Sequence, residues 1–205
     1  MTNQNKETEE QIKNMAISVI KSFSKAIDAR DKVTGKHSKN VAILMMNFSK
    51  YLGFSQQVTY LAYLSGMAHD IGKIGVPDRI LNKPAKLENH EFDFIKRHPD
   101  IGADILAEID QFKAIVPAVR YHHEWYDGTG YSHGLQGLTI PLLSRMLALC
   151  DSYDAMTTER CYRKIFAPAR AFQEIEQGSG TQFDPELSKL FIAFILQSPD
   201  YSQLQ

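Results

Sequence analysis

The chain has 205 residues, of which 43% are hydrophobic and 23% are charged, and its formal net charge at pH 7 is −1. This length and composition are typical of one globular domain with a sizeable core. The charge balance argues against non-specific binding to DNA, RNA or an anionic membrane as the main activity, because such binding needs a strongly basic chain. Residues 1–10 are polar and acidic, and no apolar run is long enough to span a membrane, so we expect a cytoplasmic protein.

The N-terminal part of the chain is predicted to form three helices. Between residues 8 and 29 apolar side chains recur every three or four positions, which is the pattern of an amphipathic helix. These side chains are Ile12, Ala16, Val19, Phe23 and Ala26. Residues 1–30 are therefore expected to pack on the rest of the domain, residues 31–205, or on a partner such as a second copy of the chain. Helices over about 36–52 and 55–70 follow, the first ending at Gly53 and the second beginning at the N-cap Ser55.

The middle of the chain is predicted to contain a Gly- and Pro-rich connection and several short helices. The connection covers residues 71–86, with one helical turn at 78–81. The helix after it, over 88–97, is expected to end at His98-Pro99, because the residue before a proline disfavours the α conformation. Helices over 101–109 and 117–122 come next. Residues 124–139 form a long loop with four glycines, and loops of this length in compact domains are usually functional.

The C-terminal part is also predicted to be helical. Pro141 opens an apolar helix over 142–156 that contains Asp151 and Asp154. Helices over 167–177 and 185–196 close the chain, and Asp184 is placed to cap the second of them ahead of a proline. No segment alternates in the manner of a strand, so the sequence predicts an all-α bundle.

Five of the seven histidines and two aspartates stand at predicted helix ends or inside an apolar helix. They are His37, His69, Asp70, His98, His122, His123 and Asp151. Neutral imidazole and ionised carboxylate are good ligands for divalent metals, and one carboxylate can bridge two ions. Converging helix ends are a common way to build such a site from residues distant in sequence. The sequence therefore predicts a metal centre, with His90 and His133 left at the surface.

The same residues belong to an ordered series of motifs that runs from about residue 26 to residue 193. The motifs are Thr34-Gly35-Lys36-His37, His69-Asp70-Ile71-Gly72-Lys73, Lys83-Pro84, His98-Pro99, His122-His123-Glu124, Asp127-Gly128-Thr129-Gly130-Tyr131, Asp151-Ser152-Tyr153-Asp154-Ala155 and Phe183-Asp184-Pro185-Glu186. In this order the chain resembles the HD-GYP family, a branch of the HD phosphohydrolase superfamily associated with bacterial hydrolysis of cyclic dinucleotides, above all cyclic di-GMP. The resemblance implies an HD-domain helical bundle with a C-terminal helical extension.

The resemblance also implies a centre of two divalent metal ions. One ion would be held by His37, His69, Asp70 and Asp151. Asp70 would bridge to the second ion, which His98, His122 and His123 would complete. Iron and manganese are typical of the family, and zinc, nickel and magnesium remain open for this ligand set.

Further roles follow for residues around the metals. Lys73 is expected to neutralise charge in the transition state and, with the bridging Asp70, to take part in catalysis. The positions of Arg160 and Arg163 match family positions that contact substrate phosphates, and Tyr131 is expected to border or stack on a guanine. Glu124 is expected to orient a ligand histidine without binding the metal itself.

Two positions depart from the family pattern. Val33 stands where some members carry an acidic residue that resembles a ligand for a third metal, so we expect two metals. Gly130-Tyr131-Ser132 replaces the family's Gly-Tyr-Pro, which bears on loop rigidity and on base specificity.

These features together predict a metal-dependent phosphodiesterase that opens cyclic di-GMP to pGpG through a hydroxide shared by two metals, with hydrolysis on to GMP left open. Three alternatives remain: 3′,3′-cyclic GMP-AMP as the substrate, a non-catalytic module that binds the dinucleotide and signals to a partner, and a general nucleotide phosphohydrolase of the wider superfamily. Regulation is expected through the 8–29 helix, a separate protein or the expression level.

Overall fold

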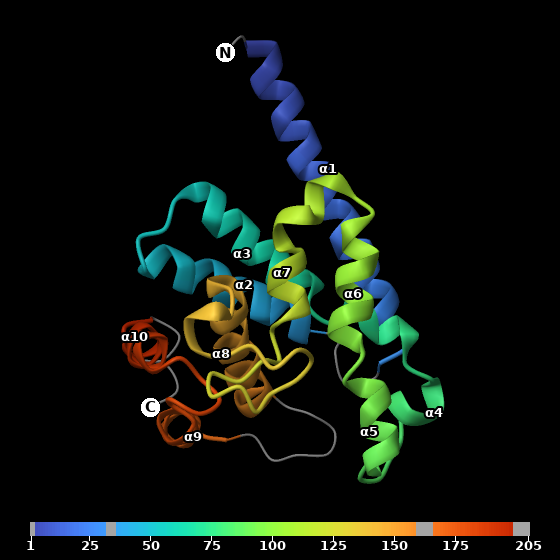
Figure 1. The fold of residues 1–205 in the computed structure, drawn as a ribbon. Helices are drawn as coiled ribbons and strands as arrows, with labels where there is room; N and C mark the ends of the chain where they lie inside the picture. Colours follow the sequence, from blue (N-terminus) through green and yellow to red (C-terminus); the bar gives the residue numbers. More distant parts are fainter. Residues whose placement is uncertain (1–2, 32–35, 159–165, 199–205) are drawn as a thin grey trace.

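The computed structural model describes residues 3–31, 36–158 and 166–198, and the regular structure in these ranges is helical apart from one isolated β-bridge between Ser179 and Phe183. The α-helices are α1 (Asn3–Asp28), α2 (His37–Tyr51), α3 (Gln56–Ala68), α4 (Asp78–Leu81), α5 (Asn89–Ile95), α6 (His98–Ala107), α7 (Val116–Arg120), α8 (Leu142–Thr157), α9 (Pro168–Gln177) and α10 (Pro185–Leu196). The 3-10 helices η1 (Ile71–Gly75), η2 (Asp110–Ile115) and η3 (Gly137–Thr139) lie in the connections. The predicted all-α class is confirmed (Figure 1).

The helices pack around two hydrophobic clusters. One joins α2, α3 and α8 to the C-terminal helices α9 and α10, and it includes Phe48 and Phe191, whose ring centroids are 5.1 Å apart. The other joins α1, α2 and α3 to η1, α6, η2 and α7 through buried residues such as Ile20, Leu64 and Leu106. Because α2 and α3 contribute to both clusters, they connect the two halves of the bundle.

Several helix ends lie where capping residues in the sequence predict them. The side chain of Ser55 accepts a hydrogen bond from the backbone N–H three residues later, as an N-cap does. Asp184 does the same for two N–H groups in the first turn of α10. Gly53 follows α2 with a φ of +74°, a conformation that glycine adopts without strain.

Two predicted boundaries are wrong. His98 does not end a helix but is the first residue of α6, with Pro99 second. Proline fits the first turn because the N–H it lacks would have no partner within the helix there. The helix predicted over 117–122 ends at Arg120, and the preceding residues form η2, for which the sequence showed no clear signal.

The N-terminal helix α1 packs on the domain with a face that overlaps the predicted one only in part. Ala16, Ile20 and Ile27 are buried, whereas Ile12 and Met15 are 45% and 69% exposed. Figure 1 shows the N-terminal half of α1 extending beyond the other helices. Among the described residues, no helix is long and apolar enough to cross a bilayer.

Candidate metal centre

The turn after α3 brings two histidine-bearing elements together. His69 is the C-cap residue of α3, and Asp70 leads into η1. Gly72 in η1 lies against the start of α6, where an added Cβ atom would stand 1.9 Å from the carbonyl oxygen of His98 and 2.5 Å from the backbone nitrogen of Gly102. Only glycine permits this approach, so the backbone itself sets His98 beside His69 and Asp70.

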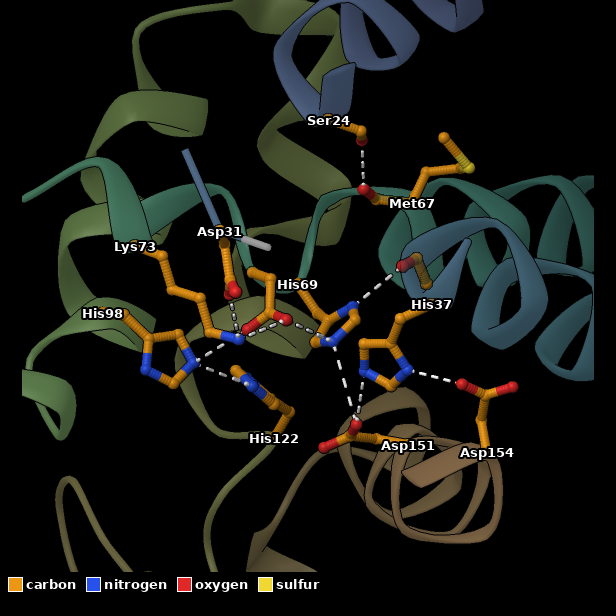
Figure 2. Close-up of polar contacts among 12 residues, drawn as sticks. Ser24, Asp31, His37, Met67, His69, Lys73, His98, His122, Asp151 and Asp154 are labelled. Carbon is orange, nitrogen blue, oxygen red and sulfur yellow. Dashed lines mark hydrogen bonds and ion pairs between the residues drawn. The ribbon is translucent and has the colours of Figure 1, made fainter. Parts of the chain in front are cut away.

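The structure brings all seven predicted ligands together in one region. Six of them form two groups, in each of which the candidate ligand atoms lie within 4.8 Å of one another. The groups are His37, His69 and Asp70, and His98, His122 and His123. Asp151 on α8 adjoins the first group through its contact with His37, as Figure 2 shows. That these side chains bind metal remains a prediction. Their geometry can be compared with what a metal site requires.

Three of the imidazoles are oriented by main-chain carbonyl groups. The Nδ1 atoms of His69, His98 and His122 lie 2.8, 2.7 and 2.6 Å from the carbonyl oxygens of the residues three positions earlier. A carbonyl oxygen can only accept, so each Nδ1 donates and the lone pair of the neutral ring lies on Nε2. Metal-binding histidines are commonly held in this way.

The Nε2 atoms of these rings lie close together in the centre, but they form no hydrogen bonds with one another because none of them carries a proton. His98 Nε2 lies 3.3 Å from His122 Nε2, so two lone pairs face each other. His69 Nε2 is buried and has no hydrogen-bond partner within the described part of the chain. Buried polar atoms are almost always paired, and a cation in each group would satisfy these nitrogens. The donor set therefore fits a metal ion.

Burial keeps the three-histidine group uncharged. It lowers the pKa of His98 to about 3 and that of His123 to about 4. It also lowers the pKa of His122 well below the usual value, and repulsion by the neighbouring histidines adds to this effect. All three rings are therefore neutral at pH 7, which is the form that binds metals.

Asp70 lies between the two groups. Its Oδ2 atom is 3.3 Å from Nε2 of His69, and its Oδ1 atom is 3.5 Å from Nε2 of His98. Burial raises the pKa of this carboxyl, but the positive charge of Lys73 is the main effect that opposes burial, and the pKa lies well below its usual range. An ionised carboxylate with one oxygen toward each group is suited to bridging two cations.

Two carboxylates of α8 hold His37. Its Nε2 atom is 2.9 Å from Oδ1 of Asp151, and its Nδ1 atom is 2.6 Å from Oδ2 of Asp154. Burial lowers the pKa of His37, but these two hydrogen bonds raise it to about 9. Burial likewise raises the pKa of Asp151, and the hydrogen bond from His37 brings it well below the usual value. Asp154 is missing from the predicted site, although its spacing of three residues from Asp151 places both on one helix face.

Lys73 extends from η1 to the carboxylate of Asp70. Its Nζ atom is 2.8 Å from Oδ2 of Asp70 and 3.5 Å from Oδ2 of Asp31. Burial lowers the pKa of Lys73, but the two carboxylates raise it above the usual value, so the ammonium stays charged. Asp31 is not among the predicted site residues, because nothing in its local sequence relates it to a lysine 42 residues away.

Two other predicted residues lie beside the centre. The ring of Tyr131 stacks on that of His123 with centroids 4.8 Å apart, so that this face is not available to a base. Glu124 is buried and accepts hydrogen bonds from the backbone N–H groups of His133 and Gly134. These hydrogen bonds fix the 124–139 loop, and the expectation that Glu124 orients a ligand histidine stays a prediction.

Three predicted residues lie outside the described ranges. They are Val33, Arg160 and Arg163. The number of metals inferred from Val33 and the phosphate contacts inferred from the two arginines therefore remain predictions.

A comparison with protein families matches residues 21–187 to the HD domain. The chain belongs to the HD domain family. The matched range contains all seven candidate ligands.

Curated relatives align with most of this HD domain. It is 43% identical over 163 residues to a cyclic di-GMP phosphodiesterase of Pseudomonas aeruginosa, covering 79% of this chain and 39% of that one. It is 38% identical over 201 residues to a cyclic di-GMP phosphodiesterase of Vibrio cholerae, covering 91% and 41%. A 3′3′-cGAMP-specific phosphodiesterase of Vibrio cholerae is 33% identical over 187 residues, covering 91% and 41%. The chain spans about two fifths of the length of these relatives.

Two solved structures share the fold. A cyclic GMP-AMP-specific phosphodiesterase of Vibrio cholerae superposes with a TM-score of 0.65 at 20% identity, covering 90% of this chain and 51% of that one. An HDG"Y"P protein from Bdellovibrio bacteriovorus superposes with a TM-score of 0.66 at 18% identity, covering 94% and 64%. The predicted HD-domain helical bundle is confirmed by these matches, and the names of the relatives agree with the resemblance to the HD-GYP branch.

Proposed function

We propose that this HD domain is a metal-dependent phosphodiesterase that hydrolyses cyclic di-GMP to pGpG, with further hydrolysis to GMP left open. The observation that carries the proposal is the placement of Asp70, whose two oxygens face separate groups of buried histidines. Such a carboxylate suits a pair of ions of the kind that cleaves phosphodiesters. The relatives named cyclic di-GMP phosphodiesterases support the substrate class.

We propose that the centre holds two divalent ions. The ligands of one would be His37, His69, Asp70 and Asp151, and those of the other Asp70, His98, His122 and His123. Iron or manganese is the proposed metal, and zinc, nickel and magnesium stay open because nitrogen and carboxylate ligands suit all of them to some degree. When bound, such a pair acidifies water and withdraws charge from the phosphoryl and leaving oxygens of a diester.

Residues of the chain would bind the substrate around this pair. Lys73 carries a positive charge at the edge of the centre, where it can offset the charge that grows on the phosphoryl oxygens during attack. Arg160 and Arg163 are proposed to hold phosphate oxygens, because a guanidinium can donate two parallel hydrogen bonds. Tyr131 would border a guanine with the ring face that His123 leaves uncovered.

The second candidate substrate is 3′,3′-cyclic GMP-AMP. A relative named for that substrate aligns over 91% of this chain, and Ser132 replaces the proline of the Gly-Tyr-Pro motif in the loop beside the centre. Because the metals act on the phosphodiester and not on the base, both substrates fit the same chemistry. The base-contacting loop would decide between them.

The test combines metal analysis with product identification. Protein purified without oxygen should contain about two metal ions per chain and should convert cyclic di-GMP to pGpG, in line with two-metal hydrolysis. Hydrolysis rates on cyclic di-GMP and 3′,3′-cyclic GMP-AMP at equal concentration give the substrate preference. The double variant His69→Ala/Asp70→Ala should lose both metal and turnover, and hydrolysis by that variant would overturn the proposal.

Other outcomes would favour the alternatives. A metal-loaded chain that binds cyclic di-GMP without any turnover would indicate a binding module that passes the signal to a separate regulatory partner. Activity confined to nucleoside monophosphates would indicate a general phosphohydrolase of the HD superfamily.

A further inference from the structure

The segment that follows α1 contacts the turn that carries Lys73. We propose that Arg30 and Asp31 are positioning residues that hold the ammonium of Lys73 in place at the centre. This inference rests on the function proposed above, because it assigns Lys73 a role in phosphodiester hydrolysis.

Arg30 binds the main chain of η1 and of the residues after it. Its Nη1 atom donates to the carbonyl oxygen of Ile74 at 2.6 Å, and its Nη2 atom donates to that of Val76 at 3.0 Å and to the carboxylate of Asp78 at 2.7 Å. The carbonyl oxygen of Arg30 accepts a hydrogen bond from Nδ2 of Asn82 at 2.9 Å. The backbone directly after Lys73 is therefore tied to the end of α1.

Asp31 acts on the side chain of Lys73. Its carboxylate is 4% exposed, and its Oδ2 atom lies 3.5 Å from the ammonium that also contacts Asp70 (Figure 2). A lysine ammonium sits on a flexible four-carbon stem and has no preferred direction of its own. Two carboxylates on different elements restrict it to one place, so loss of either one frees the ammonium to move.

A third contact holds α1 on the other side of the His-Asp pair. Ser24 Oγ donates to the carbonyl oxygen of Met67 at 2.6 Å, two residues before His69. Contacts of α1 and of the residues directly after it thus lie before and after the ligands His69 and Asp70, while none of the seven candidate ligands lies on α1 itself.

Kinetics of the Asp31→Asn variant test the role of Asp31. Asparagine keeps the shape but removes the charge, so kcat should fall about tenfold or more, while KM stays within about twofold and the metal content is unchanged. In a Lys73→Met background the same substitution should cost no further activity, because the two residues act as a unit. Asp31→Glu should restore part of kcat. Asp110→Asn, which breaks the exposed pair with Lys113, is the matched control and should change nothing.

A second measurement does not depend on activity. In metal-free protein whose lysines carry ¹³C-methyl groups, the NMR signal of Lys73 can be assigned from its loss in Lys73→Met. We expect Asp31→Asn to shift this signal, and Arg30→Gln to broaden or shift it while leaving Asp31 intact. The signal of Lys21, exposed on α1, should stay in place in both variants.

The inference is overturned if Asp31→Asn keeps its kcat, if its loss of kcat parallels a loss of metal, or if the loss is equally large without Lys73. An unchanged Lys73 signal in both variants would also overturn it. If the wild-type chain hydrolyses neither dinucleotide, the proposed function fails, and the NMR measurement still decides whether Asp31 and Arg30 hold the ammonium.

Discussion

Single atoms of the histidine rings decide what the centre can bind. Where Nδ1 donates to a carbonyl oxygen, as in His69, His98 and His122, the proton is fixed on the outer side of the ring and the lone pair points inward. His37 differs, because both of its nitrogens contact carboxylates and its pKa is raised to about 9. Metal binding at His37 must therefore displace a proton, whereas the three-histidine group is already neutral at pH 7.

Replacing His98 by glutamine should remove one metal and leave the other. Glutamine retains polar volume but not the Nε2 lone pair, so the bound metal should fall from about two ions to about one per chain, with at least about a 100-fold loss of turnover. Elemental analysis and steady-state kinetics measure both effects. His90→Gln is the control, because its side chain is 70% exposed. Full metal content in the His98 variant would contradict the two-ion arrangement.

At the scale of the elements, the contact between η1 and α6 depends on Gly72, which has no side chain. Gly72→Ala would place Cβ 1.9 Å from the carbonyl oxygen of His98, so the two backbones must separate. We expect a destabilisation of about 1–3 kcal/mol, the usual range for overpacking, together with reduced metal content. Urea denaturation and elemental analysis test this. Gly75→Ala is the matched control in the same helix, since its Cβ meets only the flexible end of the Ile101 side chain. Equal behaviour of the two variants would refute the argument.

The helix α1 exposes apolar side chains on the face that points away from the domain. Ile12, Met15 and Val19 line a groove with Ile109 and Phe112 of the neighbouring segment. Such a groove suits a second amphipathic helix. If the homodimer predicted through residues 8–29 forms, we expect this groove to be its contact surface.

The dimer is tested by the mass in solution. Light scattering of the wild type should give twice the chain mass, and Ile12→Glu/Met15→Glu should halve it, because two buried carboxylates would oppose the contact. Leu190→Glu on α10, where the leucine is 41% exposed, should leave the mass unchanged. A wild type that is monomeric at high concentration would show that α1 serves another purpose.

For the whole molecule, metal binding should act as a cross-link. The candidate ligands lie on or next to elements that contribute to the two hydrophobic clusters, with His37 and Asp151 on α2 and α8 and the others on or next to α3, η1, α6 and α7. Each ion that binds only the folded chain, at a free concentration 100 times its Kd, adds about 2.7 kcal/mol, or a rise in Tm of about 5–10 °C for a chain of this size. Calorimetry after chelation and after metal is restored should show this change. The His69→Ala/Asp70→Ala variant should not respond, and an unchanged Tm in the wild type would contradict the cross-link.

The agreement between sequence and structure differs from one element to another. The helix starts at Ser55 and Asp184 follow from capping side chains that bind backbone groups two or three residues away. The buried face of α1 does not follow in this way, because α1 carries more apolar residues than one face needs. The choice of Ile20 over Ile12 depends on where α3 and η1 lie.

The sequence by itself determined the helical class, most helix positions and the set of seven candidate ligands, because periodicity, capping and residue type act over a few neighbouring residues. The resemblance to the HD-GYP family already implied a place for Asp70 between the two groups, whereas only the tertiary structure decided that Asp154 holds His37 and that Asp31 contacts Lys73. The last two contacts join residues 117 and 42 positions apart. A buried carboxylate takes whichever partner the packing of distant helices brings to it, and no local pattern in the chain records that choice.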